Sequence, residues 1–219
     1  PLTQAQTAQQ EVFGEHYYQT NQIQSSFTEN DDDYTFLVVG DWGRNGHFAQ
    51  RSVAKWMDIA AYQFDAEMII STGDNFYDNG IASVNDPYWQ SSYENIYYGP
   101  HLFIDWYVVL GNHDYRGNWQ AQIDYSAISR RWNMPAQYFD KLITLEAGGS
   151  VHLIFLDTSP LNPDYQHEAK YRETQRQDSK AQLAWFEQTL KRHQNANWTI
   201  VIGHHPLYSS GKRYGKTSA

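Results

Sequence analysis

Cysteine is absent from this chain of 219 residues, and its absence excludes several kinds of site at once. A protein without thiols has no disulfide framework, no thiolate-bound zinc and no cysteine nucleophile. Long apolar runs are also missing, because no stretch of the sequence approaches the roughly 20 residues that a membrane-spanning helix needs. We therefore expect no membrane partner.

Positive charge is scarce. The sequence holds 16 Lys and Arg against 25 Asp and Glu, a formal net charge of −9. This balance argues against nucleic acid as a partner. It also repels phosphate esters unless local positive charge offsets it, and bound metal cations are one source of such charge.

Residues 1–33 are Gln-rich and polar and end in an Asn-Asp-Asp-Asp run, so we expect an N-terminal arm there. The remaining residues, 34–219, are enough for one catalytic domain with its own core. Aromatic residues make up 16% of the chain, so Tyr, Trp and Phe are expected to supply much of the buried area.

Short Val-, Ile- and Leu-rich runs predict strands at 34–39, 67–72, 106–110 and 198–202, and a hairpin at 138–145 and 151–156. Helical periodicity predicts helices at 48–64 and 179–193, and polar segments predict a loop with a short helix at 76–100 and an exposed loop at 160–177. The faces expected to be buried on the two helices are Val53, Trp56, Met57, Ala60 and Phe64, and Leu183, Trp185, Phe186 and Leu190. The alternation of strands and helices indicates an α/β fold with parallel pairing.

Four of these strands end in a glycine followed by a group able to bind a metal: Gly40-Asp41, Gly73-Asp74, Gly111-Asn112 and Gly203-His204. One such match would be ordinary turn chemistry. Ligands gather at the carboxyl ends of strands in α/β sheets, so four matches in series indicate a shared site. Oxygen and nitrogen donors of these kinds suit hard or borderline metal ions.

The motif order Gly-Asp-Trp-Gly, Gly-Asp-Asn-Phe-Tyr, Gly-Asn-His-Asp and Gly-His-His-Pro resembles that of the binuclear metallophosphoesterases. A tyrosine three residues after Asp74 narrows the resemblance to the purple acid phosphatases, in particular the tartrate-resistant type. The fold that this implies is a layered α/β/β/α sandwich with two mixed sheets flanked by helices.

The resemblance implies two metal ions, Fe(III) and a divalent ion (Zn, Fe or Mn), held by five residues: Asp41, Asp74, Tyr77, Asn112 and His204. Asp41 and Tyr77 resemble ligands of the ferric ion, Asp74 the carboxylate that bridges both ions, and Asn112 and His204 ligands of the divalent ion. Simple chemistry agrees, because a phenolate favours trivalent iron and an anionic oxygen screens two cations about 3.5–4 Å apart.

His113 resembles the histidine that binds the substrate phosphate and protonates the leaving alkoxide. Each residue also has an ordinary alternative: a turn-forming Asp, one tyrosine among 17, or a loop histidine. His204 and His205 compete for one ligand position, and the resemblance favours His204. We expect His16, His47, His101, His152, His167 and His193 to be surface or structural residues, and Trp42 and Trp185 to be packing residues.

The function implied is an acid phosphatase that hydrolyses small phosphate monoesters by attack of a metal-bound hydroxide, secreted or periplasmic and monomeric. One alternative is a metallophosphodiesterase that acts on nucleotides with a Mn or Zn centre. Another is a non-catalytic binding protein that retains the scaffold.

The sequence departs from the family pattern in two places. The last family block, Gly-His-x-His, is missing, so we expect the catalytic domain to be truncated at its C-terminal end. Arg213 and Tyr214 stand where tartrate-resistant members place a histidine near the substrate. Arg44, Lys212 and Arg213 are candidates for attracting phosphate, with solvated surface charges as the simpler interpretation. Asp157 ends a strand without a glycine motif and stays unassigned.

Overall fold

The computed structural model describes residues 13–25 and 33–208. Its larger sheet runs in the order β1 (Phe36–Val39), β2 (Met68–Ser71), β3 (Asp105–Val108) and β4 (Trp132–Asn133), and every neighbouring pair is parallel. The strands at 34–39, 67–72 and 106–110 are confirmed with slightly shifted ends. Strand β4 was not predicted, because two residues are too few to show a period.

The smaller sheet consists of β5 (Phe139–Thr144), β6 (Ser150–Phe155) and β7 (Trp198–Ile202), in that order. Strands β5 and β6 form the predicted antiparallel hairpin, and β7 pairs with β6 in parallel. Gly148 and Gly149 turn the hairpin with φ of 93° and 94°, a left-handed conformation that costs other residues energy. This sheet is mixed, as expected, whereas the larger sheet is parallel among the described residues.

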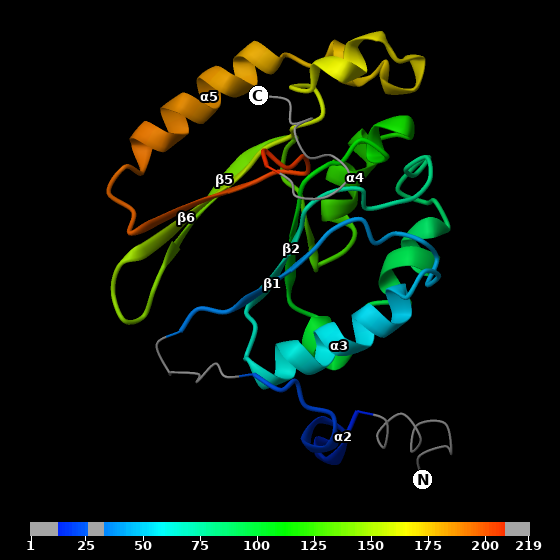
Figure 1. The fold of residues 1–219 in the computed structure, drawn as a ribbon, viewed down its shortest axis with the longest axis vertical. Helices are drawn as coiled ribbons and strands as arrows, with labels where there is room; N and C mark the ends of the chain where they lie inside the picture. Colours follow the sequence, from blue (N-terminus) through cyan, green and yellow to red (C-terminus); the bar gives the residue numbers. More distant parts are fainter. Residues whose placement is uncertain (1–12, 26–32, 209–219) are drawn as a thin grey trace.

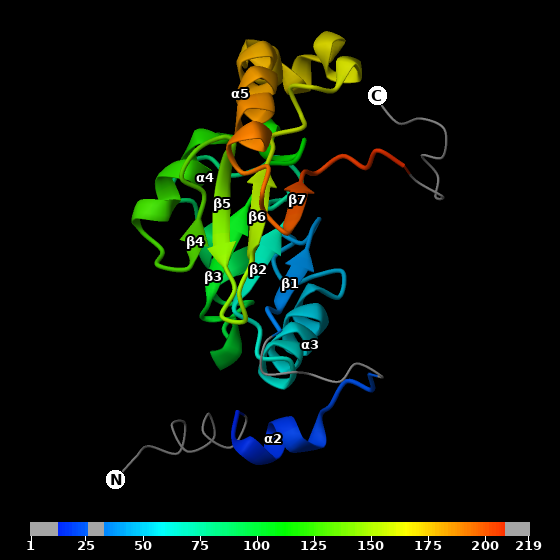
Figure 2. The same ribbon diagram turned by 90° about the vertical axis from the view of Figure 1, so that its left-hand side faces the viewer.

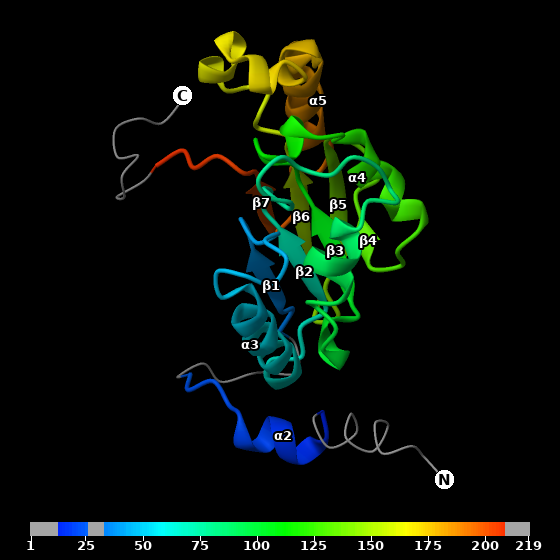
Figure 3. The same ribbon diagram turned by 90° about the vertical axis from the view of Figure 1, so that its right-hand side faces the viewer.

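The two sheets lie between two long helices (Figure 1). Helix α3 (Gln50–Gln63) covers the outer side of the larger sheet, and α5 (Ser179–Arg192) lies on the outer side of the smaller one. The side views in Figures 2 and 3 show the carboxyl ends of β1, β2 and β3 pointing toward the same end of the molecule as those of β6 and β7. This arrangement is the layered α/β/β/α sandwich expected from the sequence.

The buried face of α3 differs from the one expected. Met57 and Ala60 are buried as expected, but Val53 and Trp56 are exposed, and Ala54 and Asp58 are buried. Asp58 contacts α2 (Glu15–Thr20), a helix inside the segment expected to be a polar arm. Tyr18 of α2 donates a hydrogen bond of 2.8 Å to the Asp58 carboxylate, which stabilises the buried charge.

Helix α5 also buries a different face from the predicted one. Leu183 and Leu190 are exposed and Trp185 is half-buried against Tyr138, while Gln182 is buried. Gln182 exchanges two hydrogen bonds of 2.9 Å with the backbone of Asp157, so polar contacts fix the position of this helix. Apolar periodicity could not find such a face.

The remaining helical segments are short and connect the strands. They are a π-helical turn at Trp89–Glu94, helix α4 at Gln120–Asp124, and 3-10 turns at Pro100–Leu102, Asp114–Arg116, Tyr125–Ala127, Pro163–His167, Ala169–Tyr171 and Thr174–Arg176. The expectation of an exposed loop at 160–177 is wrong for Tyr165, Tyr171 and Thr174, which are buried. In the described part of the chain, helices fall short of the length and apolarity needed to cross a bilayer.

Aromatic side chains dominate the core beneath the carboxyl ends of the larger sheet. Trp42 lies edge-on to Phe76, Tyr97 and Trp106, and Trp89 stacks on Tyr125 with ring centroids 3.5 Å apart. These residues, with Trp132, are almost fully buried. The packing role expected for Trp42 is therefore confirmed. The turns at the strand ends pack on this buried aromatic cluster.

Candidate metal centre

Two Gly-Asp turns place carboxylates at the carboxyl ends of β1 and β2. Asp41 and Asp74 have φ of 59° and 51°, in the left-handed region that aspartate tolerates better than most residues. The Asp41 backbone N–H donates to the carbonyl oxygen of Gly73 at 3.0 Å, which joins the two turns. Because β1 and β2 are parallel neighbours, both carboxylates face the same space.

The turn after β3 packs directly on the turn after β2. A Cβ atom at Gly111 would lie 2.2 Å from the backbone nitrogen of Asp74, so only glycine permits this approach. The backbone N–H of His113 then donates to Asp74 Oδ1 at 2.7 Å. The glycine of the third motif therefore brings Asn112 and His113 to the two carboxylates.

Tyr77 connects the two carboxylates. Its hydroxyl lies 2.6 Å from Asp41 Oδ1 and 2.8 Å from Asp74 Oδ2. Burial, together with hydrogen bonds and repulsion from both carboxylates, raises the pKa of Tyr77 well above its ordinary value. Without a cation this phenol keeps its proton. The Tyr77 oxygen nevertheless lies between the two carboxylates, where it could serve as a third oxygen ligand of a bound metal.

His204 enters from the smaller sheet, directly after β7. Its Nδ1 lies 3.0 Å from the carbonyl oxygen of Thr72, which can only accept, so this ring nitrogen donates there. The other ring nitrogen, Nε2, faces Asn112 Oδ1 at 3.3 Å and Asp74 Oδ1 at 3.5 Å. Three atoms able to bind a metal thus converge.

The donor set fits a metal site by its chemistry and its spacing. One donor atom from each of Asp41, Asp74 and His204 lies within 4.8 Å of the other two. Tyr77 and Asn112 add two oxygens at hydrogen-bond distance from these groups. The structure therefore brings all five predicted ligands to one place, and carboxylate, phenolate, amide and imidazole donors suit iron or zinc.

His113 lies beside the same group. Its Nδ1 is 2.6 Å from the carbonyl oxygen of Asp78, which leaves Nε2 facing Asp74 Oδ2 at 3.9 Å. Its ring packs against Tyr77 with centroids 4.3 Å apart. Burial is the main cause that lowers the pKa of His113, and the nearby Asp74 carboxylate opposes it.

His205 points away from the metal-binding group. Its ring nitrogens contact Thr158 Oγ1 at 2.7 Å and the Tyr165 hydroxyl at 2.8 Å. The backbone nitrogens of His204 and His205 both donate to Thr158 Oγ1, which holds the turn and sends the two rings in different directions. Of the two competing histidines, only His204 faces the predicted ligands.

Sequence reasoning missed a second layer of polar residues. Asn112 Nδ2 donates to the Tyr171 hydroxyl at 2.9 Å, and Arg116 Nη2 donates to the same oxygen at 2.7 Å. Arg116 Nη1 also donates to the Asp78 carbonyl that holds His113. Tyr171 lies in a polar segment without periodicity, so no sequence signal marked it. Arg116 follows the third motif closely, and its charge was the one available clue.

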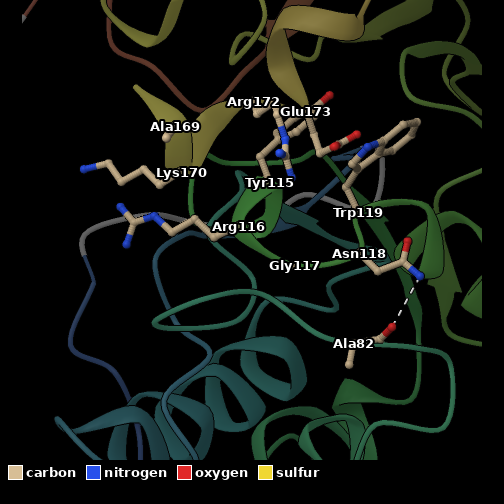
Figure 4. Close-up of a pocket in the computed structure, with 10 residues that line it drawn as sticks. All are labelled: Ala82, Tyr115, Arg116, Gly117, Asn118, Trp119, Ala169, Lys170, Arg172 and Glu173. Atoms are coloured by element: carbon tan, nitrogen blue, oxygen red, sulfur yellow. Dashed lines mark hydrogen bonds between the residues drawn. The ribbon is translucent and has the colours of Figure 1, made fainter. Parts of the chain in front are cut away.

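A pocket of about 520 Å³ adjoins this second layer (Figure 4). Arg116 and Lys170 project beside each other at one end of it, and both lie about 5 Å from the Tyr171 ring, at 5.3 and 4.9 Å. Arg172 adds a third cationic side chain and Glu173 one acidic side chain. In a chain of net negative charge, this pocket is locally basic.

Arg44 packs over the Tyr77 ring, with its guanidinium 3.6 Å from the ring centroid. It also forms an ion pair of 3.5 Å with Asp78. Arg44 is thus a neighbour of the candidate centre rather than an isolated surface charge. Lys212, Arg213 and Tyr214 lie outside the described residues.

Residues 34–219 match the family described as calcineurin-like phosphoesterase. The chain is 40% identical over 192 residues to purple acid phosphatase 17 of Arabidopsis thaliana, and 34% identical over 184 residues to tartrate-resistant acid phosphatase type 5 of Homo sapiens. These matches cover 84% and 80% of this chain but only 55% and 56% of the relatives. The chain therefore spans about half the length of the curated relatives it matches.

Solved structures with the same fold include GAP50, described as the anchor in the inner membrane complex of Plasmodium. It has a TM-score of 0.68 and 26% identity, and the match covers 84% of this chain and 57% of that one. A dimetal phosphatase from Danio rerio matches with a TM-score of 0.50 and 10% identity over 81% of this chain and 71% of that one, which is a likeness of fold alone. The family match covers most of the sequence, and the fold and the order of the turns agree with it: the chain belongs to the calcineurin-like phosphoesterase family.

Proposed function

We propose that this chain carries most of the metal-binding residues of an acid phosphatase that hydrolyses phosphate monoesters at an Fe(III)–divalent metal centre. The observation that supports this most is the meeting of Asp41, Asp74 and His204 with the Tyr77 hydroxyl between the carboxylates. The names of the relatives point the same way.

In this proposal Asp41 and Tyr77 would hold the ferric ion, Asn112 and His204 would hold the divalent ion, and Asp74 would be shared by the two. The ions would supply a Lewis acid for the phosphate oxygens and an acidified water as nucleophile. The residues of the chain do the positioning: the Thr72 carbonyl orients the ring of His204, and the Tyr171 hydroxyl orients the amide of Asn112. Such fixed partners keep ligand atoms aimed at the centre.

His113 is proposed to bind the substrate phosphate and to protonate the leaving oxygen. The Asp78 carbonyl holds its Nδ1–H and leaves Nε2 directed toward the centre. A general acid must carry its proton at the working pH. Since burial lowers the pKa of His113, this proton is present only in acid, which agrees with an acid phosphatase.

The basic pocket is proposed to take the rest of the ester. Arg116 shares the Asp78 carbonyl with His113, so the pocket begins beside the group that would protonate the leaving oxygen. Lys170 is on the same side, although Glu168 pairs with it at 2.9 Å. An ester with a second anionic group would gain contacts there that a neutral one would not.

The test is elemental analysis and kinetics on the full-length protein. We expect about two metal ions per chain, including iron, and Asp74→Ala is expected to lose both ions and turnover. Asp124→Ala, at an exposed carboxylate outside the centre, is the control and should keep both. Finding no metal in the wild-type protein, or full turnover in Asp74→Ala, would reject the proposal.

A second candidate is a non-catalytic scaffold, and the likeness to the Plasmodium anchor protein favours it. Hydrolysis of an aryl phosphate at acidic pH, with and without added metal, separates the two. No hydrolysis by a metal-loaded protein would favour the scaffold. Secretion or periplasmic export and a monomeric state remain predictions.

A further inference from the structure

A second group of metal-binding side chains lies away from the candidate centre, where α5 meets the β5–β6 hairpin. Asp140 comes from β5, His152 from the adjacent β6, and His193 from the C-cap of α5. None of the three belongs to a glycine motif, and the two histidines were expected to be ordinary surface or structural residues. The structure instead gathers them around one point.

The spacing of the three donor atoms is that of metal ligands. Asp140 Oδ2 lies 3.0 Å from His152 Nε2 and 3.7 Å from His193 Nε2, and all three donor atoms are within 4.8 Å of one another. Tetrahedral zinc with bonds of about 2.0–2.2 Å requires ligand atoms roughly 3.3–3.5 Å apart. Small side-chain movements would bring the observed distances to that range.

The two oxygens of Asp140 have different neighbours. Oδ2 faces both imidazoles, whereas Oδ1 faces Arg192 Nη1 at 3.5 Å. A positive side chain on the outer oxygen orients a ligating carboxylate without occupying the inner one. Arg192 is half exposed, so its charge is screened on the outer side.

The burial of His152 and the position of His193 at the C-terminus of α5 also favour the binding of a cation at this cluster. The His152 side chain is fully buried and its Nδ1 has no hydrogen-bond partner among the described residues, so its polar contact is made through Nε2. His193 closes the C-terminus of α5, where unpaired carbonyls give the helix its negative end. The His193 side chain is 25% exposed, which leaves a path from solvent to the cluster.

We propose that Asp140, His152 and His193 form a third, separate metal site that binds a divalent ion of the zinc class with water in the fourth position. Two imidazoles and one carboxylate with an open position form a ligand set that zinc uses in proteins. The unpartnered Nδ1 of His152 lacks the acceptor that strengthens most metal-binding histidines, so we expect an affinity in the micromolar range.

The site would fasten the end of α5 to the smaller sheet. Near its other end, α5 is held by the two hydrogen bonds of Gln182 with the Asp157 backbone. In a chain without cysteine, a metal that joins three elements would serve as the cross-link that a disulfide supplies elsewhere. This inference does not depend on the phosphatase proposal.

The experiment measures the zinc bound per full chain. All variants are made in the Asp74→Ala protein, called the background, so that the candidate centre binds as little of the measured zinc as possible. The protein is dialysed near neutral pH against free zinc at roughly ten times a micromolar dissociation constant. We expect about one zinc per chain in the background, and loss of that zinc in His193→Gln and in Asp140→Asn. His16→Gln, at an exposed histidine of α2, is the matched control and should keep it.

Thermal unfolding provides a second readout. Zinc at about 100 times its dissociation constant should raise the melting temperature of the background by roughly 5–10 °C. His193→Gln should abolish that rise while keeping the melting temperature measured in chelator, because His193 is partly exposed and its loss leaves no cavity. Equal zinc counts and equal temperature shifts in the background, His193→Gln and Asp140→Asn proteins would overturn the proposal.

Discussion

The backbone N–H of Asn75 donates to the buried carboxylate of Asp114 at 3.1 Å, and this contact joins the turn after β2 to the turn after β3. Asp114 also accepts from the backbone of Gly111 at 2.8 Å and from the Gln122 side chain at 2.8 Å. Burial first, and the neighbouring Asp74 second, raise the pKa of Asp114 to about 7. One aspartate thus fixes the spacing of the second and third motifs through hydrogen bonds within the chain.

Asp157 should make stability depend on pH. Burial raises the pKa of this carboxyl from 3.8 to about 6, against hydrogen bonds from Tyr115 and Gln137. Between these values the folded chain holds a proton that the unfolded chain has released, so its contribution to stability falls as pH rises. Between about pH 4 and pH 7, the unfolding free energy of the wild type should therefore fall by about 2 kcal/mol more than that of Asp157→Asn, which has no carboxyl at this position. Urea unfolding at several pH values measures this, and Asp124→Asn is the exposed control. Parallel pH profiles for wild type and Asp157→Asn would contradict the prediction.

Tyr77→Phe should remove colour without unfolding the chain. If the Tyr77 phenolate binds iron, its charge transfer gives a visible absorption band, and phenylalanine cannot supply it. The substitution also removes one oxygen ligand of the proposed iron site, so we expect iron to be held about 10-fold less tightly. The visible spectrum of the iron-loaded protein measures the band.

Tyr138→Phe is the matched control for Tyr77→Phe, because Tyr138 packs against Trp185. A band of equal strength in all three proteins would show that Tyr77 is not the ligand. A colourless wild-type protein active with manganese or zinc would instead support the nucleotide phosphodiesterase alternative.

Motif reasoning predicted that the side chains of the candidate centre would meet because it depends on strand ends, and strand ends can be predicted from short apolar runs. Asp41, Asp74 and Asn112 lie together for the reason expected, because parallel strands bring their carboxyl ends to one edge of the larger sheet. His204 joins them from the end of β7 in the smaller sheet. The glycine before a ligand also has a physical reason, because a side chain at Gly111 would collide with the backbone of Asp74. Tyr77 followed from its spacing to Asp74.

The supporting residues could not be predicted, because their positions follow from tertiary contacts alone. Tyr171 lies 59 residues from Asn112, in a segment with no regular period, and the Asp140 cluster joins two strands and a helix end. The predicted buried faces were wrong for much of α5 and for part of α3, for a related reason. Asp58 and Gln182 are buried by polar contacts, which hydrophobic periodicity does not detect.

Arg116→Gln should weaken the binding of substrates that carry a second anionic group. Arg116 and Lys170 lie beside each other in the basic pocket (Figure 4), and a charged hydrogen bond to substrate is lost in the variant. We expect KM to rise about 10-fold for a diphosphate ester and little for phenyl phosphate, with kcat nearly unchanged for both. Steady-state kinetics with the two substrates measure this. Arg130→Gln, at an exposed arginine, should change neither. An equal loss of kcat for both substrates would mean that Arg116 acts only by holding Tyr171 and Asp78, and not by binding the substrate.

His113→Asn should lower kcat most for esters with poor leaving groups. An alkyl phosphate needs a proton on its leaving oxygen, so we expect kcat to fall by about 10²–10⁴-fold, whereas p-nitrophenyl phosphate, whose leaving group is stable as an anion, should lose much less. Since burial lowers the pKa of His113 below 6.5, the protonated form is lost as pH rises through that lowered value. In the wild-type protein, kcat for the alkyl ester should therefore decline with rising pH in this range, and the decline should flatten in His113→Asn. His16→Asn, in α2, should keep the wild-type profile. Equal losses for the two esters, with an unchanged pH profile, would assign His113 to positioning the turn through its backbone contact with Asp74 rather than to proton transfer.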